Sequence, residues 1–261
     1  MEATREWLLR AARRAVCAML ALGAWSMSTP ADTQSSDTLA RQRAAMVDEV
    51  VEMARDTGRE TGRPTFAPEV LDAMRRVQRH RFVPDALARE AYANRPLPIG
   101  NGQTISQPYI VALSTDLLDL KRTHRVLEVG TGSGYQAAVL AVLVDRVYSI
   151  EIVEPLGREA AARLAALGYG NVEVRIGDGY RGWPEQAPFD RILVTAAAPY
   201  VPDPLLGQLA DGGRMVIPVG AGMFGQQLLV IDKDADGRTR QRNVLPVRFV
   251  PLTGPGVGRP R

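Results

Sequence analysis

A glycine-rich turn is the part of this sequence whose residue types could most directly bind a ligand. The strand-like segment 125–129 leads into Gly130, Gly132 and Gly134, and an apolar stretch begins at Tyr135. Glycines permit a tight turn and let backbone N–H groups approach a ligand, while the next helix offers the positive end of its dipole. The sequence therefore predicts a strand, a ligand-binding turn and a helix.

The spacing of the glycines narrows the class of ligand. They stand at intervals of two and two, whereas the dinucleotide-binding fingerprint places its third glycine three residues after the second. A nicotinamide-dependent dehydrogenase is therefore disfavoured. A purely structural alternative stays open, in which Gly134 only allows close packing of a helix.

Acidic residues follow at the ends of the next two predicted strands. Glu151 ends one strand, and Asp178 lies between Gly177 and Gly179 after the other. A carboxylate at the carboxyl edge of such a sheet can accept hydrogen bonds from ribose hydroxyls, as proposed for Glu151, or from an exocyclic amine, as proposed for Asp178. Singly, these residues could be a solvated strand end and an ordinary turn. Together they predict an adenosine-type ligand.

The elements that must position these residues alternate along the chain. Strands are expected at 125–129, 147–151, 172–176, 189–196 and 214–219, and helices at 135–143, 155–167 and 204–210. This alternation predicts an α/β fold with a doubly wound, mostly parallel sheet and helices on both faces. Strands 227–232 and 244–250, joined by the polar turn 233–239, predict an antiparallel C-terminal hairpin that completes seven strands.

An N-terminal helical extension precedes the sheet. Residues 39–55 and 68–78 carry apolar side chains at helical spacing, which predicts two amphipathic helices. Residues 81–107 contain three internal prolines, which favours an irregular segment that could cover a site.

The first 28 residues need separate treatment. Three arginines precede the apolar run 15–25, as in a secretory signal peptide, but an amphipathic or frayed extension is the equal alternative. The run is too short to span a bilayer, which takes roughly 20 residues. Residues 26–37 are polar and are predicted to form a linker. A cytoplasmic location is expected, with a periplasmic one if the leader directs export.

Composition excludes several classes of function. The formal charge is +3 without a Lys or Arg block, so no nucleic-acid partner is expected. Two histidines and one cysteine, with no cluster at ligand spacing, predict no metal site. No stable membrane association is expected, and a monomer is the expected state.

The glycine-rich motif resembles that of a known family of enzymes. The segment Glu128-Val-Gly-Thr-Gly-Ser-Gly134 is similar to the cofactor motif of class I S-adenosylmethionine-dependent methyltransferases. The segments 80–84 and 98–108 resemble the substrate-side segments of protein-L-isoaspartate O-methyltransferases, and 189–196, 212–220 and 247–252 also resemble that family. The resemblance covers residues 46–254.

The resemblance implies a protein-repair enzyme that transfers a methyl group from S-adenosyl-L-methionine to the α-carboxyl of L-isoaspartyl residues in damaged proteins and peptides. We expect a signal-like or disordered leader and linker at 1–38, a methyltransferase domain at 39–254 with its substrate-side segment at 39–120, and a flexible tail at 255–261. The expected cofactor-binding residues are Glu128, Gly130, Thr131, Gly132, Ser133, Gly134, Glu151, Asp178 and Gly179. The expected catalytic residue is Ser106, and the expected substrate-binding residues are Gln103, Thr104, Ile105 and Gln226.

The residues around Ser106 also predict a role for it independently of the resemblance. It precedes Gln107, Pro108 and an apolar-periodic run, so it is predicted to be a helix N-cap beside an anion site. We expect it to orient a substrate carboxylate, with in-line transfer driven by proximity and exclusion of water. A capping role alone is the alternative. The assignment of Gln226 is loose, because the loop 221–228 aligns poorly with the family's pattern.

Other functions stay open at this point. A methyltransferase for another carboxylate would share the cofactor residues but not the segment 103–108. A non-catalytic S-adenosylmethionine-binding protein is also compatible with the glycine turn.

Overall fold

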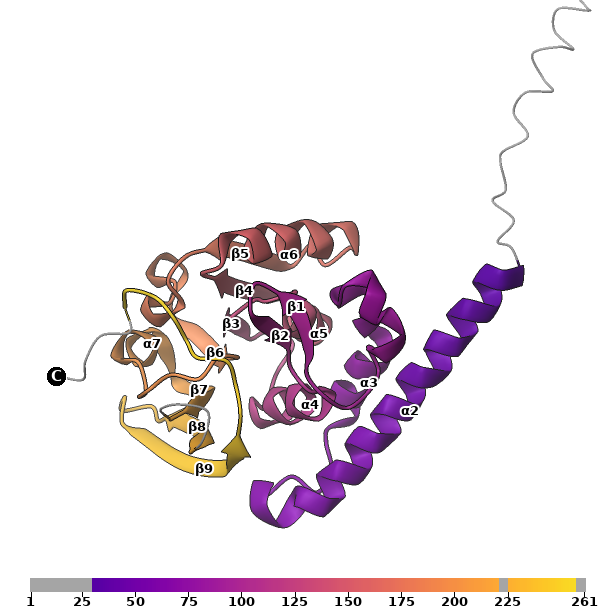
Figure 1. Ribbon diagram of the computed structural model, residues 1–261. Helices are drawn as coiled ribbons and strands as arrows, with labels where there is room; N and C mark the ends of the chain where they lie inside the picture. The colour runs from indigo at the N-terminus through magenta and orange to yellow at the C-terminus, as the bar shows by residue number, and fades with distance from the viewer. Residues whose placement is uncertain (1–29, 221–224, 257–261) are drawn as a thin grey trace, which may run out of the picture. The chain divides into compact units, whose positions relative to one another are not determined.

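The computed structural model describes residues 30–220 and 225–256, and its centre is a seven-stranded sheet flanked by helices (Figure 1). The chain divides into two compact units between Thr38 and Leu39. The sheet belongs to the second unit. No helix in the described ranges is both long and apolar enough to cross a membrane.

The first described helix is longer than predicted. Helix α2 spans Pro30–Thr61, whereas the sequence predicted a linker over 26–37 and a helix only over 39–55. Proline is well tolerated in the first turn of a helix, and polar residues can extend a helix without joining a core. The linker prediction was therefore wrong from Pro30 onward, and residues 26–29 lie outside the described residues.

The sheet has the predicted class of topology. Its strands are β3 (Arg125–Val129), β4 (Arg146–Glu151), β5 (Val172–Ile176), β6 (Phe189–Val194), β7 (Leu209–Val219), β8 (Gln226–Lys233) and β9 (Thr239–Val247). They lie in the order β5-β4-β3-β6-β7-β8-β9, parallel except for the antiparallel pairs β7–β8 and β8–β9. The strand order reverses between β3 and β6, which is where open α/β sheets bind ligands.

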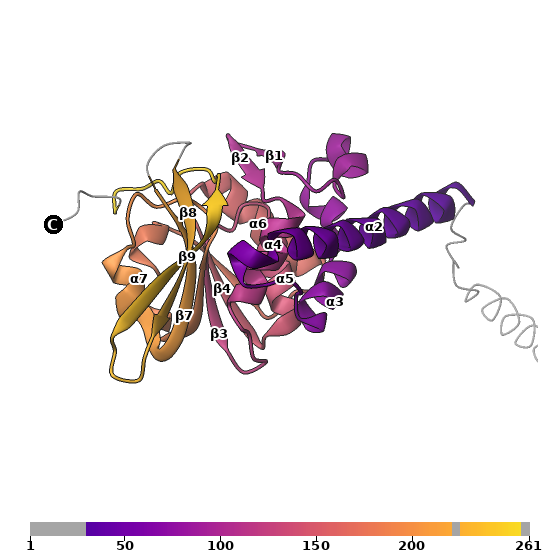
Figure 2. The ribbon, with the colours of Figure 1, turned by 90° about the horizontal axis from the view of Figure 1, so that it is seen from below.

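Helices cover both faces of this sheet. The α-helices after α2 are α3 (Pro68–Arg76), α4 (Pro108–Leu117), α5 (Tyr135–Leu143), α6 (Glu154–Ala166) and α7 (Asp203–Gln208). Short 3₁₀ helices are η1 (Arg79–Phe82), η2 (Asp85–Glu90), η3 (Gly179–Arg181) and η4 (Pro184–Gln186). Figure 2 shows the sheet nearly edge-on, with α7 on one side and α3, α4 and α5 on the other.

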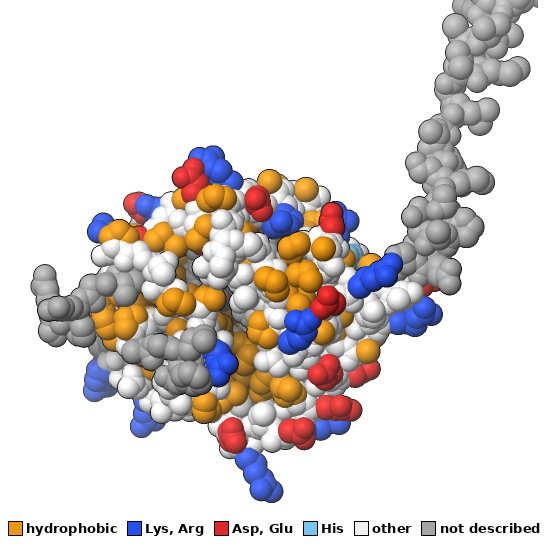
Figure 3. Space-filling view, in the orientation of Figure 1, with side chains coloured by type: hydrophobic (Ala, Val, Ile, Leu, Met, Phe, Trp, Pro, Cys, Tyr) orange, Lys and Arg blue, Asp and Glu red, His pale blue; other side chains and the backbone are white. Residues whose placement is uncertain are grey.

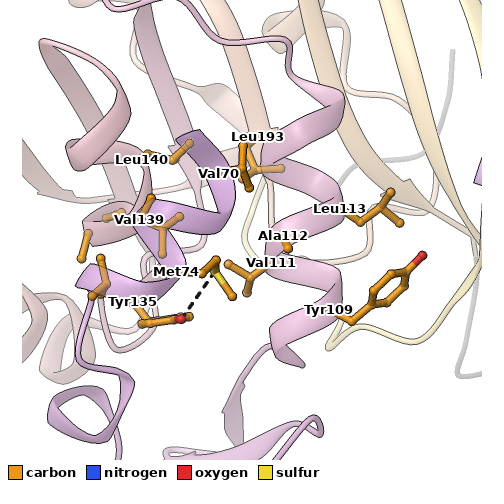
Figure 4. Close-up of a cluster of buried hydrophobic side chains, with 14 of the residues drawn as sticks. Val70, Met74, Tyr109, Val111, Ala112, Leu113, Tyr135, Val139, Leu140 and Leu193 are labelled. Atoms are coloured by element: carbon orange, nitrogen blue, oxygen red, sulfur yellow. Dashed lines mark hydrogen bonds between the residues drawn. The ribbon is translucent and has the colours of Figure 1, made fainter. Parts of the chain in front are cut away.

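Two apolar cores fix these layers. One lies between α3, α4, α5 and the sheet, and the other lies between the sheet and α7. Figure 4 shows the first core, where the Tyr135 hydroxyl of α5 reaches the Met74 sulfur of α3 at 3.6 Å. Dense packing around Tyr135 matters for the site because this residue directly follows the glycine turn.

The C-terminal hairpin forms, but its strands are shifted. Strand β9 begins at Thr239, five residues before the predicted strand, and ends at Val247 rather than residue 250. The prediction followed apolar side chains, whereas residues 239–243 are polar and exposed. Backbone pairing with β8 does not depend on those side chains, and an edge strand tolerates charge.

A second hairpin lies in the segment predicted to be irregular. Strands β1 (Leu97–Gly100) and β2 (Gln103–Ile105) pair antiparallel around the two-residue turn Asn101–Gly102. Both turn residues have positive φ, +53° and +71°. An Asn-Gly pair is a strong signal for this kind of tight hairpin turn, and the nearby prolines masked it.

Candidate active site

The glycine turn lies at the carboxyl end of β3, where the strand order reverses. Gly130, Gly132 and Gly134 have φ values of +102°, +54° and +91°. A Cβ at Gly130 would lie 2.4 Å from the Thr195 hydroxyl oxygen at the end of β6. The glycines are therefore required both by the backbone conformation and by the close approach of two strand ends.

A cleft opens over this turn, and we call it the cofactor cleft. It is open to solvent and lies at the carboxyl edge of the sheet. Its lining residues are Gln103, Thr104, Ile105, Ser106, Val111, Val129, Gly130, Thr131, Gly132, Ser133, Tyr135, Gln136, Ile150, Glu151, Ile152, Val153, Gly179, Thr195, Ala196, Val250, Pro251, Leu252 and Thr253. Most of the predicted cofactor and substrate residues therefore meet in one place.

Glu151 is held in the wall of this cleft by backbone donors. Its Oε2 accepts a hydrogen bond from the Gly132 N–H at 2.7 Å, and its Oε1 accepts one from the Val153 N–H at 2.9 Å. Each carboxylate oxygen keeps a second lone pair. Glu151 can therefore accept hydroxyl donors while its own position is fixed.

Glu128 lies beneath the glycine turn rather than in the wall of the cleft. It is fully buried and accepts a hydrogen bond from the Ser149 hydroxyl, which in turn lies 2.6 Å from the Thr131 hydroxyl. Burial raises the pKa of Glu128 to about 8, against a smaller lowering by the Ser149 bond. This geometry suits a protonated side chain that supports the turn from behind. Direct contact of Glu128 with a ligand stays a prediction.

Asp178 also lies away from the cleft wall, although its neighbour Gly179 lines it. The Asp178 carboxylate caps η3 by accepting the Tyr180 N–H at 3.0 Å. Its other oxygen accepts the Gly256 N–H at 2.6 Å. An acidic residue before a helical turn is a natural cap, so this carboxylate already has a structural use. Its proposed bond to an exocyclic amine stays a prediction.

A second cleft, which we call the substrate groove, adjoins the first. Its lining residues are Pro96, Thr104, Ser106, Gln107, Ile110, Thr195, Gly225, Gln226, Leu245, Pro246, Val247, Arg248, Phe249 and Val250. Thr104, Ser106, Thr195 and Val250 line both clefts. Figure 3 shows hydrophobic side chains gathered around a hollow on this face. The two clefts therefore meet at these four residues, and we call this place the junction.

The sequence predicted Ser106 as the N-cap of α4, and this prediction was wrong. The N-cap residue is Gln107, with ψ of +135°, and Pro108 occupies the first helical position. A proline disfavours helical conformation in the residue before it, so the helix begins one residue later than expected. Within the described ranges no hydrogen bond engages the Ser106 hydroxyl, which is therefore available to a ligand at the junction of the clefts.

The hairpin β1–β2 carries Gln103, Thr104 and Ile105 to the same junction. The Ile99 side chain would lie 3.3 Å from a Cβ at Gly132, so the hairpin packs directly on the glycine turn. The buried Arg79 anchors the chain leading into the hairpin, since its Nε donates to the Ala91 carbonyl at 2.8 Å. Its guanidinium also lies 4.9 Å from the centre of the Tyr135 ring.

Gln226 fixes the far wall of the substrate groove. Its Nε2 donates to the Phe249 carbonyl at 3.1 Å, and its Oε1 accepts the Phe249 N–H at 2.6 Å. These bonds hold the chain that leaves β9 against β8. The structure thus brings Gln226 to the groove, while its contact with a substrate stays a prediction.

Sequence reasoning missed two contributors to the junction. Thr195, whose hydroxyl donates to the Gly130 carbonyl at 2.7 Å, follows the strand beside β3. The segment 250–253 crosses the cleft, where the Ala197 N–H donates to the Val250 carbonyl at 2.8 Å. Thr195 could have been found because it follows a parallel strand at the ligand-binding edge. The crossing of the C-terminal segment has no comparable local signal.

Comparisons with known proteins agree with this geometry. Residues 49–256 match the family described as Protein-L-isoaspartate(D-aspartate) O-methyltransferase. The chain is 60% identical over 220 residues to Protein-L-isoaspartate O-methyltransferase 2 of Syntrophobacter fumaroxidans, which covers 84% of this chain and 89% of the relative. It is 59% identical over 209 residues to a Polaromonas protein of the same name, covering 80% and 99%.

Two solved structures share the fold over most of the chain. A protein-L-isoaspartate O-methyltransferase superposes with a TM-score of 0.69 and 27% identity, covering 81% of this chain and 67% of that one. A Plasmodium falciparum beta-aspartate methyltransferase in complex with S-adenosyl-L-homocysteine gives a TM-score of 0.63 and 25% identity, covering 77% and 97%.

Proposed function

This chain belongs to the protein-L-isoaspartate(D-aspartate) O-methyltransferase family, and from that premise we infer that it repairs damaged proteins by methylating the α-carboxyl group of their L-isoaspartyl residues. It is an S-adenosyl-L-methionine-dependent protein carboxyl O-methyltransferase. The observation that carries the proposal is that Thr104, Ser106, Thr195 and Val250 line both clefts. A donor on one side and a protein substrate on the other would meet there.

The residues of the cofactor cleft fit S-adenosyl-L-methionine. When bound, this cofactor supplies an electrophilic methyl group on a sulfonium centre. The left-handed glycines leave the backbone of the turn open to close approach by a ligand, and bonds from the N–H groups of Gly130, Gly132 and Gly134 to other protein groups hold the turn rigid. Glu151 keeps acceptor capacity for ribose hydroxyls. Glu151 is also the only charged residue among the described residues that line the cleft, and a negative side chain suits a cationic ligand.

Ser106 is proposed to orient the substrate carboxylate. An α-carboxyl group has a pKa of roughly 3.5 and is ionised at neutral pH, so it needs no strong base to act as a nucleophile. The Ser106 hydroxyl can donate a hydrogen bond that fixes one carboxylate oxygen and leaves the other for transfer. Apolar walls around it, such as Val111 and Val250, exclude water from the junction.

His80 is not proposed as a base. Its Nδ1 lies 2.7 Å from the Tyr92 hydroxyl oxygen, and it lines neither cleft in the described structure. Burial, together with Arg43 and Arg81, lowers the pKa of His80. Its contacts fit a structural residue in the segment that supports the hairpin β1–β2.

The proposed activity is tested by transfer of a labelled methyl group from S-adenosyl-L-methionine to paired peptides. The two peptides have one sequence and differ only in a normal or an isoaspartyl linkage. We expect label in the isoaspartyl peptide alone. Equal labelling of both peptides, or label in neither, would reject the repair function.

The location and oligomeric state belong to the same proposal. We expect the enzyme to act as a monomer in the cytoplasm, where its cofactor is made, on proteins rather than nucleic acids. Residues 1–28, which resemble a signal peptide, lie outside the described residues. Cell fractionation with N-terminal sequencing of the isolated protein tests the location, because export would leave a shortened chain in the periplasm. Light scattering of the purified protein measures its mass.

A further inference from the structure

The two clefts carry opposite charges. Among the described residues that line the substrate groove, Arg248 is the only charged one. The remaining wall is largely apolar and includes Ile110, Leu245 and Phe249. In the view of Figure 3, basic side chains lie at the edge of the hollow among hydrophobic ones. Arg248 is exposed, so water and salt partly screen its attraction for a carboxylate bound in the groove.

The backbone that carries Arg248 is firmly held. It follows directly after β9, and the next residue, Phe249, is fixed by both amide atoms of Gln226. One residue further, the Val250 carbonyl accepts the Ala197 N–H at 2.8 Å. Arg248 is exposed, but it therefore stands at a fixed point of the groove wall.

Arg248 lies close in the chain to the junction, where the methyl group is proposed to be transferred. Arg248 lines only the substrate groove, whereas Val250, two residues later, lines both clefts. Two residues of extended chain span at most about 7 Å. A peptide whose isoaspartyl residue lies at the junction would thus bring a residue one or two positions away opposite Arg248. Arg248 should affect the substrate and leave the cofactor alone.

We propose that Arg248 is a specificity-determining residue that favours isoaspartyl sites with an Asp or Glu side chain within two positions. This inference rests on the proposed function. A carboxylate next to the damaged residue would pair with the guanidinium, whereas a Lys or Arg there would be repelled. A partly exposed ion pair of this kind gives a preference of about twofold to fivefold.

The test uses isoaspartyl peptides that carry Glu, Gln or Lys two residues before or after the isoaspartyl residue. For the native chain at low salt we expect kcat/KM in the order Glu, Gln, Lys at one of these positions, with the difference mainly in KM. Arg248→Gln should make the three peptides nearly equal, and Arg248→Lys should keep the order. Added salt should narrow the preference because it screens a partly exposed charge pair.

Arg240→Gln is the matched control, because Arg240 lies exposed on β9 and does not line the groove. It should keep the native order of peptides. An unchanged order in Arg248→Gln would overturn the inference. An equal loss for all three peptides would also overturn it, since Arg248 would then bind the acceptor carboxylate itself. Labelling of the Gln peptide by the native chain establishes methylation of isoaspartyl peptides independently of either result, and no labelling of any peptide would reject both proposals.

Discussion

The cofactor cleft and the substrate groove are built in different ways. The main wall of the cofactor cleft comes from residues 129–136 and 150–153, close together in sequence, and presents backbone groups of a glycine turn. The groove joins residues 104–110 to 245–250, far apart in sequence, and presents apolar side chains with one cation. A ligand of constant structure can be bound by a rigid backbone surface with one fixed carboxylate. A protein substrate that varies around one damaged residue is better met by adaptable apolar contacts.

The comparison predicts that a change in the glycine turn acts on the cofactor. Gly130→Ala would strain a residue with φ of +102° and place a Cβ 2.4 Å from the Thr195 hydroxyl oxygen. We expect cofactor affinity to fall roughly a hundredfold. Titration calorimetry with S-adenosyl-L-homocysteine measures this. Gly168→Ala is the control, since Gly168 also has positive φ but open space around it, and it should leave affinity unchanged.

A change at the junction should act on turnover instead. Ser106→Ala removes the proposed donor to the substrate carboxylate, so we expect kcat to fall roughly tenfold to a hundredfold with cofactor affinity nearly unchanged. Glu151→Gln should mainly weaken cofactor binding. Single-turnover methylation and cofactor calorimetry on both variants separate the two effects. If each variant shows the effect expected of the other, the assigned roles are exchanged.

A change behind the groove should act on the peptide. Gln226→Leu removes both bonds to Phe249, so the chain after β9 loses its support. We expect the KM for an isoaspartyl peptide to rise about fivefold to tenfold. Cofactor affinity should change less than about twofold, because Ala197 still holds Val250. Equal losses in both measurements would show that the two clefts are not independent.

The smallest effect on catalysis is expected at Glu128, which supports the glycine turn without lining it. Its pKa is about 8 in the folded chain, against an ordinary value of 4.5. The unfolded chain releases this proton above pH 4.5, so the contribution of Glu128 to stability falls as pH rises from there to about 8. Glu128→Gln should gain stability over the native chain by up to about 1.4 kcal/mol per pH unit in this window.

Urea unfolding of both proteins between pH 5 and about pH 8 measures this difference. A difference that stays constant with pH would mean that Glu128 is ionised when folded. At neutral pH the variant should keep kcat within about twofold, since the amide preserves the shape that supports the turn.

The sequence predicted the cofactor cleft, built from residues close together in the chain, better than the contacts between distant segments. The structure brings the glycine turn and Glu151 to one cleft because strand ends of a parallel sheet meet at one edge, while their contact with a cofactor stays a prediction. Ser106 entered mainly through resemblance, and its predicted capping role was wrong because Pro108 shifts the helix start. Thr195 and the segment 250–253 were missed. Asp178 was assigned to a ligand although Gly256, 78 residues later, contacts its carboxylate. Contacts that join distant segments leave no periodic trace in the chain.

The turn between β1 and β2 has a chemical consequence for the enzyme itself. Gly102 has no side chain to shield its backbone nitrogen, which can attack the Asn101 side-chain amide, expel ammonia and form a cyclic imide that water opens to aspartate or isoaspartate. The isoaspartate form adds a methylene to the backbone at the tip of a hairpin that packs on the glycine turn. Ageing of the purified protein should therefore produce a deamidated form with lower activity, seen by mass spectrometry. Each copy of the enzyme can therefore acquire an isoaspartyl residue beside its own active site as it ages. That residue would be a substrate for another, undamaged copy of the enzyme.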